Sequence, residues 1–259
     1  MKRKIALMRP AGRSEEAARI CREAGVEPVI APAIEISGMD VDRKRLHGAL
    51  KTADYCVFMS STAVERAVGE AGVSTAMLTR QGLHVVAVGT GTMKSLLSNG
   101  VSPDLPRRHS SWGVVEWVGA SAASGEVVAV LRSDSGSSVI RNGLEGKGLT
   151  VEEFPLYRIG LPADRSHLLA VVGEIIGGTQ YILPFSSSMM ARNFFMAAST
   201  AAGGLDLSAA LSRCELWAIG DETAGEVGAH YSGRCNISTR TDYESMLREI
   251  LSDSRLTQA

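Results

Sequence analysis

The chain has 259 residues, of which 45% are hydrophobic and 21% are charged, and its formal net charge at pH 7 is −1. These proportions are typical of a globular protein, and a net charge this small gives no overall field that would attract nucleic acid or an acidic membrane. We therefore expect no nucleic-acid or membrane partner, and any anion site must be local.

The N-terminus is basic, but it does not predict a signal peptide. The apolar run at residues 5–8 ends at Arg9 and Pro10, which is too short for a secretion signal or a membrane span. We expect a cytoplasmic protein whose thiols stay reduced, because the four cysteines are far apart and form no CxxC pair. They are Cys21, Cys56, Cys214 and Cys235.

Short apolar runs alternate with helical patterns along the whole chain. Residues 5–8 are typical of a buried parallel strand, and Ser14 is the expected N-cap of the helix that follows. Ala17, Ala18 and Cys21 lie on one face of that helix, and Gly25 ends it. Further strands are predicted at residues 26–30, 55–59, 85–88, 128–132, 181–185 and 216–219, and further helices at residues 40–51, 63–70, 92–98 and 112–118.

Two proline-containing segments interrupt this alternation. Residues 28–36 and residues 154–162 each contain two prolines, which fix φ and favour extended backbone in the preceding residue. We interpret them as two extended connectors that run side by side between two domains. Tyr157 is then expected to face the space between those domains.

Three blocks of sequence recur in the same order in the second half of the chain. We interpret this as an internal duplication, with strands and helices alternating in each half. That alternation predicts an α/β fold with two doubly wound parallel sheets of flavodoxin-like strand order. The matched pairs are residues 5–9 with 128–132, residues 55–62 with 181–188, and residues 85–92 with 216–223.

The connectors and the repeat together predict two domains that are interleaved in sequence. One domain is continuous and covers residues 38–154. The other is discontinuous and joins residues 1–32 to residues 163–259. A two-stranded linker made of residues 33–37 and residues 155–162 connects the two domains.

Small hydroxyl residues and glycines follow the predicted strands, at the edge of a parallel sheet where ligands collect. Most of them also open a helix, whose free N–H groups and positive dipole end favour an anion. The simpler alternative is that each serine or threonine only caps its helix, although capping and binding are compatible. The predicted carboxylate-binding or phosphate-binding residues are Arg9, Ser60, Ser61, Gly89, Thr92, Arg132, Ser186, Ser187, Gly220 and Thr223.

Several other kinds of site are not predicted. The Gly89-Thr90-Gly91 turn lacks the third glycine of a dinucleotide fingerprint, and the turn at Ser133 lacks the glycine of a GxSxG hydrolase motif. The histidines have no metal-ligand spacing. We therefore expect no metal and no dinucleotide cofactor.

The ordered blocks resemble the uroporphyrinogen-III synthase family over essentially the whole chain. The resemblance rests on residues 7–13, 57–64, 86–92, 154–158 and 218–224. It implies two α/β domains joined by a two-stranded linker, and a monomeric lyase of tetrapyrrole (porphyrin and heme) biosynthesis that needs no cofactor. In the family's reaction, linear hydroxymethylbilane closes to uroporphyrinogen III, ring D is inverted through a spiro intermediate, and water is released.

The resemblance also implies roles for particular residues. The family's important tyrosine matches Tyr157, a phenol that could donate its proton to the departing hydroxyl. The family's binding-loop residues match Ser60, Thr92, Ser186 and Thr223. The competing interpretation is a two-domain protein that binds a polycarboxylate ligand without chemistry, and only turnover separates the two.

Overall fold

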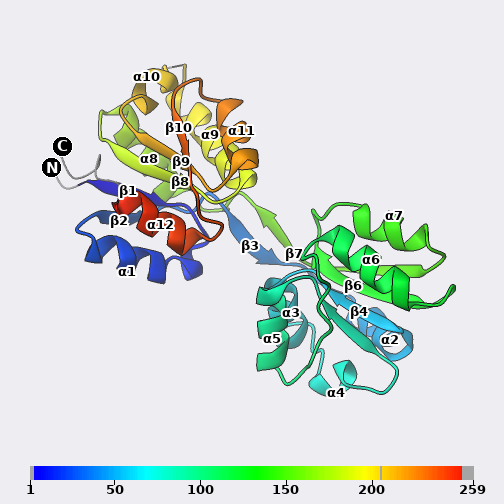
Figure 1. Ribbon diagram of the computed structural model, residues 1–259. Coiled ribbons are helices and arrows are strands. Elements are labelled where there is room, and N and C mark those ends of the chain that lie inside the picture. The colour runs from blue at the N-terminus through cyan, green and yellow to red at the C-terminus, as the bar shows by residue number, and fades with distance from the viewer. Residues whose placement is uncertain (1–2, 205, 253–259) are drawn as a thin grey trace. The chain divides into compact units, whose positions relative to one another are not determined.

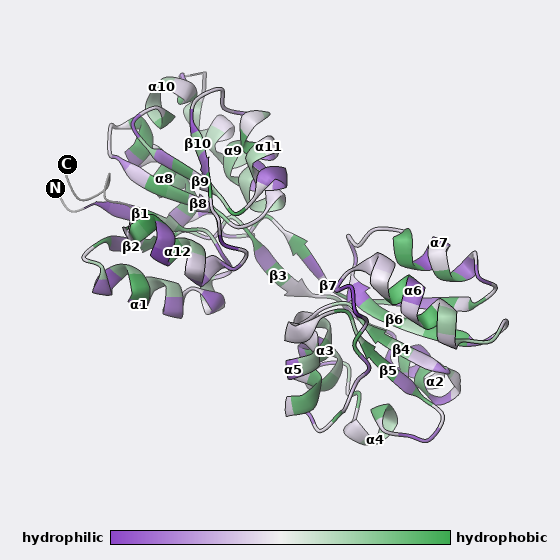
Figure 2. Ribbon diagram, viewed as in Figure 1, coloured by the Kyte–Doolittle hydropathy of each residue, from purple (hydrophilic) through white to green (hydrophobic). Residues whose placement is uncertain are grey.

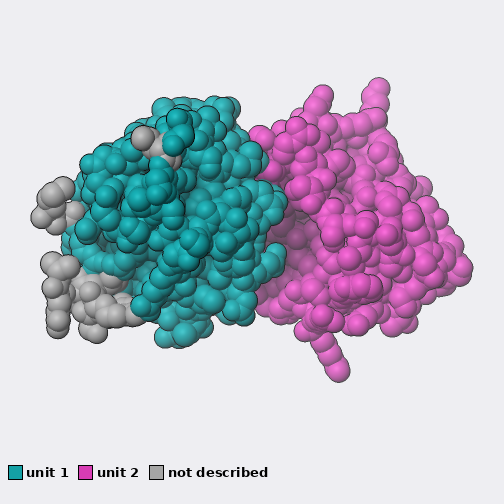
Figure 3. Space-filling view, turned by 90° about the horizontal axis from the view of Figure 1, so that it is seen from above, with its two compact units in different colours: residues 1–35, 160–259 teal, residues 36–159 magenta. Residues whose placement is uncertain are grey.

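The structure is a computed structural model that describes residues 3–204 and 206–252 (Figure 1). The chain divides into two compact units, coloured separately in Figure 3. Unit 1 consists of residues 1–35 and 160–259, and unit 2 consists of residues 36–159. Each unit contains a five-stranded sheet with helices on both faces. The predicted fold class, two doubly wound α/β sheets, is confirmed.

The sheet of unit 1 has the strand order β2-β1-β8-β9-β10, in which all neighbours are parallel. Counted along the unit this is the order 2-1-3-4-5, which is the flavodoxin-like order predicted. The strands are β1 (Lys4–Leu7), β2 (Glu27–Ile30), β8 (Tyr181–Phe185), β9 (Glu215–Ala218) and β10 (Cys235–Ile237).

Helices cover both faces of the unit 1 sheet. The helices α1 (Glu15–Glu23) and α12 (Tyr243–Ser252) share a core with Ile5 and Leu7 of β1. The opposite face carries α8 (Ser166–Ile176), α9 (Ser188–Ala202) and α11 (Asp221–Gly228), with the short α10 (Leu207–Leu211) beside them. Because both faces are covered, Ile5, Ala6 and Leu7 form an uninterrupted buried run.

Ser14 is the N-cap residue of α1, as predicted, but its side chain does not cap the helix. Ala17, Ala18 and Cys21 are buried as expected, and Gly25 takes a positive φ of 75° after the helix ends. The short 3-10 helix η1 (Ala11–Arg13), however, runs directly into α1, so Ser14 has helical backbone angles and its side chain makes no capping hydrogen bond. Its hydroxyl donates to the Pro10 carbonyl instead, at 3.3 Å.

The sheet of unit 2 has the strand order β3-β7-β6-β4-β5. Its strands are β3 (Glu35–Gly38), β4 (Tyr55–Phe58), β5 (His84–Ala87), β6 (Val127–Ser133) and β7 (Thr150–Gly160). The four parallel strands β7-β6-β4-β5 repeat the order β2-β1-β8-β9 of unit 1. The matched sequence blocks therefore occupy corresponding strands, while the duplication itself stays a prediction.

The two predicted connectors contribute β3 and β7, which are neighbours in the unit 2 sheet. The Met39 amide donates to the Leu156 carbonyl at 3.1 Å just beyond β3. β7 continues without a break to Gly160, so it includes most of the segment predicted as the second linker. Whether the predicted domains 38–154 and 1–32 plus 163–259 fold independently stays a prediction.

Alternate residues of the unit 2 strands face different helices, as a sheet covered on both sides requires. Cys56 and Phe58 pack with α2 (Arg43–Thr52), α3 (Ser61–Gly69), α4 (Thr75–Leu78) and α5 (Thr90–Ser98). Tyr55 and Val57 pack with α6 (Ser111–Ser121) and α7 (Val139–Glu145). Figure 2 shows the resulting hydrophobic colour along β4 and β6 and the mixed colour of the amphipathic α1.

All four cysteines are free thiols, and burial raises their pKa values. Cys21 and Cys56 are buried, and Cys214 and Cys235 are half-buried. Among the described residues, no helix is long and apolar enough to cross a membrane.

Candidate active site

The carboxyl ends of the parallel strands in unit 2 lie at one edge of the sheet. Ser60 follows β4, Gly89 follows β5, and Arg132 lies at the end of β6. The helix after β4 packs on one face and the helix after β6 on the other. β4 and β6 therefore flank a topological switch point, the place where open α/β sheets bind ligands.

Tyr157 reaches this edge through a bulge in β7. Arg132 pairs with Pro155, but the next residue, Ser133, pairs with Tyr157, so Leu156 is an extra residue in the strand. Simple alternation would send Leu156 and Tyr157 to opposite faces. Because of the bulge, both side chains lie in the core cluster on the α3 side.

The hydroxyl of Tyr157 lies 2.8 Å from Oγ of Ser60. Ser60 is also the N-cap of α3, and its Oγ accepts a hydrogen bond from the Ala63 amide at 3.0 Å. Only 5% of Tyr157 is exposed, and its ring packs within unit 2. The bulge thus packs the ring in the core cluster of unit 2, and the expectation that Tyr157 faces the space between the domains stays a prediction.

The backbone of Tyr157 is held by the turn after β6. The Asp134 amide donates to the Tyr157 carbonyl at 3.0 Å, and the Asp134 carboxylate accepts from Nε of Arg158 at 2.5 Å. Sequence reasoning missed Asp134, Leu156 and Arg158 as positioning groups. The available signal was Pro155, since a proline inside a strand often marks a bulge.

Arg132 was predicted to bind an anion, but its guanidinium is already engaged. Its side chain is 10% exposed, and Nη1 lies 2.5 Å from a carboxylate oxygen of Glu153. Nη2 donates to the Ser137 carbonyl at 2.9 Å. Arg141 donates to the other oxygen of Glu153, and this hydrogen bond is the main cause that raises the pKa of Arg141. Arg132 thus holds the turn after β6 in place.

Gly136 makes this arrangement of Arg132 possible. A Cβ on Gly136 would lie 1.6 Å from Nη2 of Arg132, far inside van der Waals contact. The glycine leaves room for the guanidinium in this position, and a larger residue would require the end of the Arg132 side chain to move.

The remaining predicted residues of unit 2 open helices at the same edge. Ser61 is the first residue of α3, and Gly89 is the N-cap of α5. Thr92 lies in the first turn of α5 and is 4% exposed. No acidic residue lies in that first turn, so the positive end of the α5 dipole is not offset locally.

Unit 1 has an equivalent edge after β1, β8 and β9. Ser187 caps α9 by accepting from the Met190 amide at 3.2 Å, and the Ser186 hydroxyl lies 3.8 Å from the Met190 sulfur. Gly220 is the N-cap of α11, and Thr223 lies in its first turn with 4% exposure. A Cβ on Gly220 would meet no atom within 4 Å, so packing within the protein does not require a glycine there.

The helix α11 is a poorer anion site than α5, because Asp221 and Glu222 occupy its first turn. Their negative charges stabilise the helix dipole but repel a carboxylate ligand. The two helix starts match in the sequence repeat, but the acidic residues, which the sequence already shows, distinguish them.

Arg9, the arginine of this edge, is bound to α12. Its Nη1 lies 2.8 Å from a carboxylate oxygen of Glu244, and its guanidinium lies 4.9 Å from the centre of the Tyr243 ring. The side chain of Arg9 is still 26% exposed. Arg9 can therefore meet a ligand only by sharing or exchanging its contact with Glu244.

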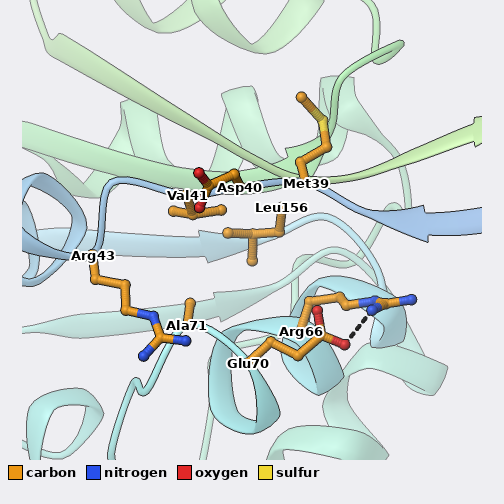
Figure 4. Close-up of a pocket in the computed structure, with 8 residues that line it drawn as sticks. All are labelled: Met39, Asp40, Val41, Arg43, Arg66, Glu70, Ala71 and Leu156. Carbon is orange, nitrogen blue, oxygen red and sulfur yellow. Dashed lines mark hydrogen bonds and ion pairs between the residues drawn. The ribbon is translucent and has the colours of Figure 1, made fainter.

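A separate pocket of about 150 Å³ opens in unit 2, beside Leu156 (Figure 4). Arg66 and Glu70 form an ion pair along one side of it, and Arg43 approaches from the start of α2. None of the predicted site residues lines this pocket. Its volume is also below the usual range for a ligand pocket, so we do not assign the candidate site to it.

A family profile described as "Uroporphyrinogen-III synthase HemD" (HEM4) matches residues 15–248. A Methanothermobacter thermautotrophicus protein named "Putative uroporphyrinogen-III synthase" is 26% identical over 230 residues, which is 87% of this chain and 89% of the relative.

Two solved structures are similar in fold. A mutant uroporphyrinogen III synthase from Thermus thermophilus aligns with a TM-score of 0.62 and 18% identity, covering 96% of this chain and 97% of that one. A uroporphyrinogen-III synthetase from Helicobacter pylori aligns with a TM-score of 0.63 and 16% identity, covering 97% of this chain and 99% of that one.

Proposed function

Because the chain belongs to the uroporphyrinogen-III synthase family, we propose that it closes linear hydroxymethylbilane to uroporphyrinogen III and inverts ring D. The observation that carries the proposal is the hydrogen bond between the Tyr157 hydroxyl and the Ser60 hydroxyl. It lies beside the switch point of the unit 2 sheet. Tyr157 is also the residue that matches the family's important tyrosine. The proposed reaction needs no metal and no cofactor, and the proposed catalyst is a cytoplasmic monomer.

The first chemical step is the loss of the terminal hydroxyl of the substrate. Tyr157 gives its phenolic proton to that hydroxyl as the carbon–oxygen bond breaks, so the bonding electron pair leaves with water. The adjacent pyrrole nitrogen supplies electrons to the carbon left behind. That carbon then bonds to the ring D carbon that already carries the bridge to ring C, which gives the spiro intermediate. The older bond from ring D to the ring C methylene breaks, with electrons from the ring C nitrogen stabilising that methylene. The methylene then bonds to the free α-carbon of ring D, so the macrocycle closes with ring D turned over. The proton released when the pyrroles regain aromaticity returns to Tyr157.

In each unit, the helix starts at the sheet edge are proposed as binding groups for carboxylates of the substrate. In unit 2 the proposed contacts are Ser61, Gly89 and Thr92, and in unit 1 they are Ser186, Ser187, Gly220 and Thr223, joined by Arg9. Helix N-termini can bind anions through free N–H groups without a strongly basic surface, in accord with the net charge of −1. Arg132 contributes by holding the turn that supports Tyr157.

Incubation with freshly prepared hydroxymethylbilane tests the proposal. The product is oxidised to uroporphyrin and its isomers are separated by chromatography. We expect the type III isomer with the protein present and the type I isomer from spontaneous closure in a sample without protein. If the folded protein binds the substrate and yields only type I, it is a binding protein and not a synthase.

A further inference from the structure

We propose that Ser60 is a positioning residue that directs the phenolic proton of Tyr157 toward the substrate. This inference rests on the proposed function and adds a role that neither the capping of α3 nor substrate binding supplies. It concerns the direction of one hydrogen bond, between Oγ of Ser60 and the oxygen of Tyr157, which are 2.8 Å apart.

Two directions are open to this hydrogen bond. A serine hydroxyl has one proton to donate and two lone pairs to accept with. The Ala63 amide can only donate, and it occupies one of the lone pairs. Ser60 can therefore either accept from Tyr157 through its second lone pair or donate its own proton to the phenol oxygen.

The second direction leaves the tyrosine proton free. If Ser60 donates, the hydrogen bonds run in one line from the Ala63 amide through Ser60 to Tyr157, and the phenolic proton points to an external acceptor. An acceptor such as the leaving hydroxyl adds a hydrogen bond to this line, and hydrogen bonds in a chain strengthen one another. If Tyr157 donated to Ser60, its proton would be withheld from the substrate.

The same direction stabilises the product of proton transfer. Once Tyr157 has given up its proton, its oxygen carries a negative charge and accepts from the Ser60 hydroxyl. Ser60 caps the N-terminus of α3, where the helix dipole favours negative charge. A donor already in place where charge develops is the arrangement that lowers a reaction barrier. Ser60 thus acts on the reaction through Tyr157.

A double-mutant cycle with isomer analysis tests this role, using the full-length chain and hydroxymethylbilane. The variants are Ser60→Ala, Ser60→Thr, Tyr157→Phe and the double variant Ser60→Ala with Tyr157→Phe. Ser74→Ala is the matched control, because Ser74 caps α4 in the same unit by accepting from the Met77 amide and belongs to no proposed site. Melting temperature, kcat, KM and the share of type III product are measured for each.

We expect Ser60→Ala to lower kcat roughly tenfold, the effect of one lost hydrogen bond, with KM nearly unchanged and less type III product. Ser60→Thr keeps the hydroxyl and should restore kcat. In the Tyr157→Phe background, Ser60→Ala should have almost no further effect. Ser74→Ala should lose a cap but keep the parent kcat.

Equal losses of kcat from Ser60→Ala in both backgrounds would show that Ser60 acts without Tyr157, and the inference would be wrong. A folded Ser60→Thr variant as slow as Ser60→Ala would also overturn it. These outcomes are distinct from failure of the proposed function, in which the parent protein itself forms no type III isomer.

Discussion

The Tyr157 hydroxyl and the Ser60 hydroxyl lie 2.8 Å apart although 97 positions separate the two residues in the chain. Tyr157 comes from β7 and Ser60 follows β4, and β6 lies between these strands in the sheet. The hydrogen bond therefore spans the end of a strand, beside the switch point of the sheet. It joins the proposed catalytic acid to the start of α3.

Replacement of Tyr157 by phenylalanine removes the hydroxyl and keeps the ring in its core cluster. We expect the melting temperature to change little and kcat to fall by about 10²–10⁴-fold, the usual effect of losing a positioned acid. A larger fraction of the substrate then closes spontaneously, so the type I isomer should increase and the type III isomer should decrease. Thermal melts and isomer analysis check this. If the variant forms the type III isomer at the parent rate, the Tyr157 hydroxyl has no catalytic role and the residue contributes only packing.

Thr92→Ala and Thr223→Ala should impair substrate use more than folding. Each threonine lies in the first turn of a helix at a sheet edge, and a lost hydrogen bond to a charged carboxylate costs about 1.5–3 kcal/mol. KM for hydroxymethylbilane and melting temperature should be measured on the same preparations. If activity falls only in proportion to the melting temperature, both residues have a structural role alone.

Asp221→Asn should lower KM, because it removes a negative charge from the first turn of α11, where the substrate carboxylates are proposed to bind. We expect the effect to be larger at low ionic strength, since salt screens exposed charges. Glu116→Gln is the matched control, because it removes the same charge from the exposed face of α6. An equal drop in KM for both variants would indicate a general charge effect and no site at α11.

Gly136→Ala should destabilise unit 2, whereas Gly48→Ala should not. A Cβ at Gly136 would displace the guanidinium of Arg132 from Glu153, and breaking a largely buried pair costs about 3–5 kcal/mol at most. A Cβ at Gly48, in the middle of α2, would meet no atom within 4 Å, and alanine there should add about 0.5–1 kcal/mol of stability. Urea denaturation measures both. Equal stability of the two variants would show that Arg132 does not hold the turn.

A fragment of residues 36–159 should unfold more cooperatively and at a higher temperature than the predicted domain of residues 38–154. The shorter fragment lacks Leu156 and Tyr157, which are 1% and 5% exposed in the core of unit 2. A fragment of residues 1–120 cuts through both units and should not melt cooperatively. Calorimetry of the three fragments decides this, and a cooperative melt of residues 1–120 alone would contradict the interleaved domain layout.

The local pattern of the sequence determined the fold class and the positions at which a ligand could bind. Continuous apolar runs such as residues 5–7 predicted strands covered on both faces, and glycines such as Gly25 predicted helix ends. The residues that follow the strands, such as Ser60 and Gly89, lie at helix starts as predicted. Such patterns act over a few residues, because strand and helix periods are local properties of the backbone.

Only the tertiary structure decided what those residues contact. Arg132 pairs with Glu153, 21 positions away, and Arg9 with Glu244, 235 positions away, so the charges predicted for a ligand already have partners in the protein. The direction of Tyr157 likewise depends on the extra residue Leu156 in the pairing with β6. Pairing register and long-range ion pairs arise only when distant segments pack together, and no periodicity within one segment encodes them.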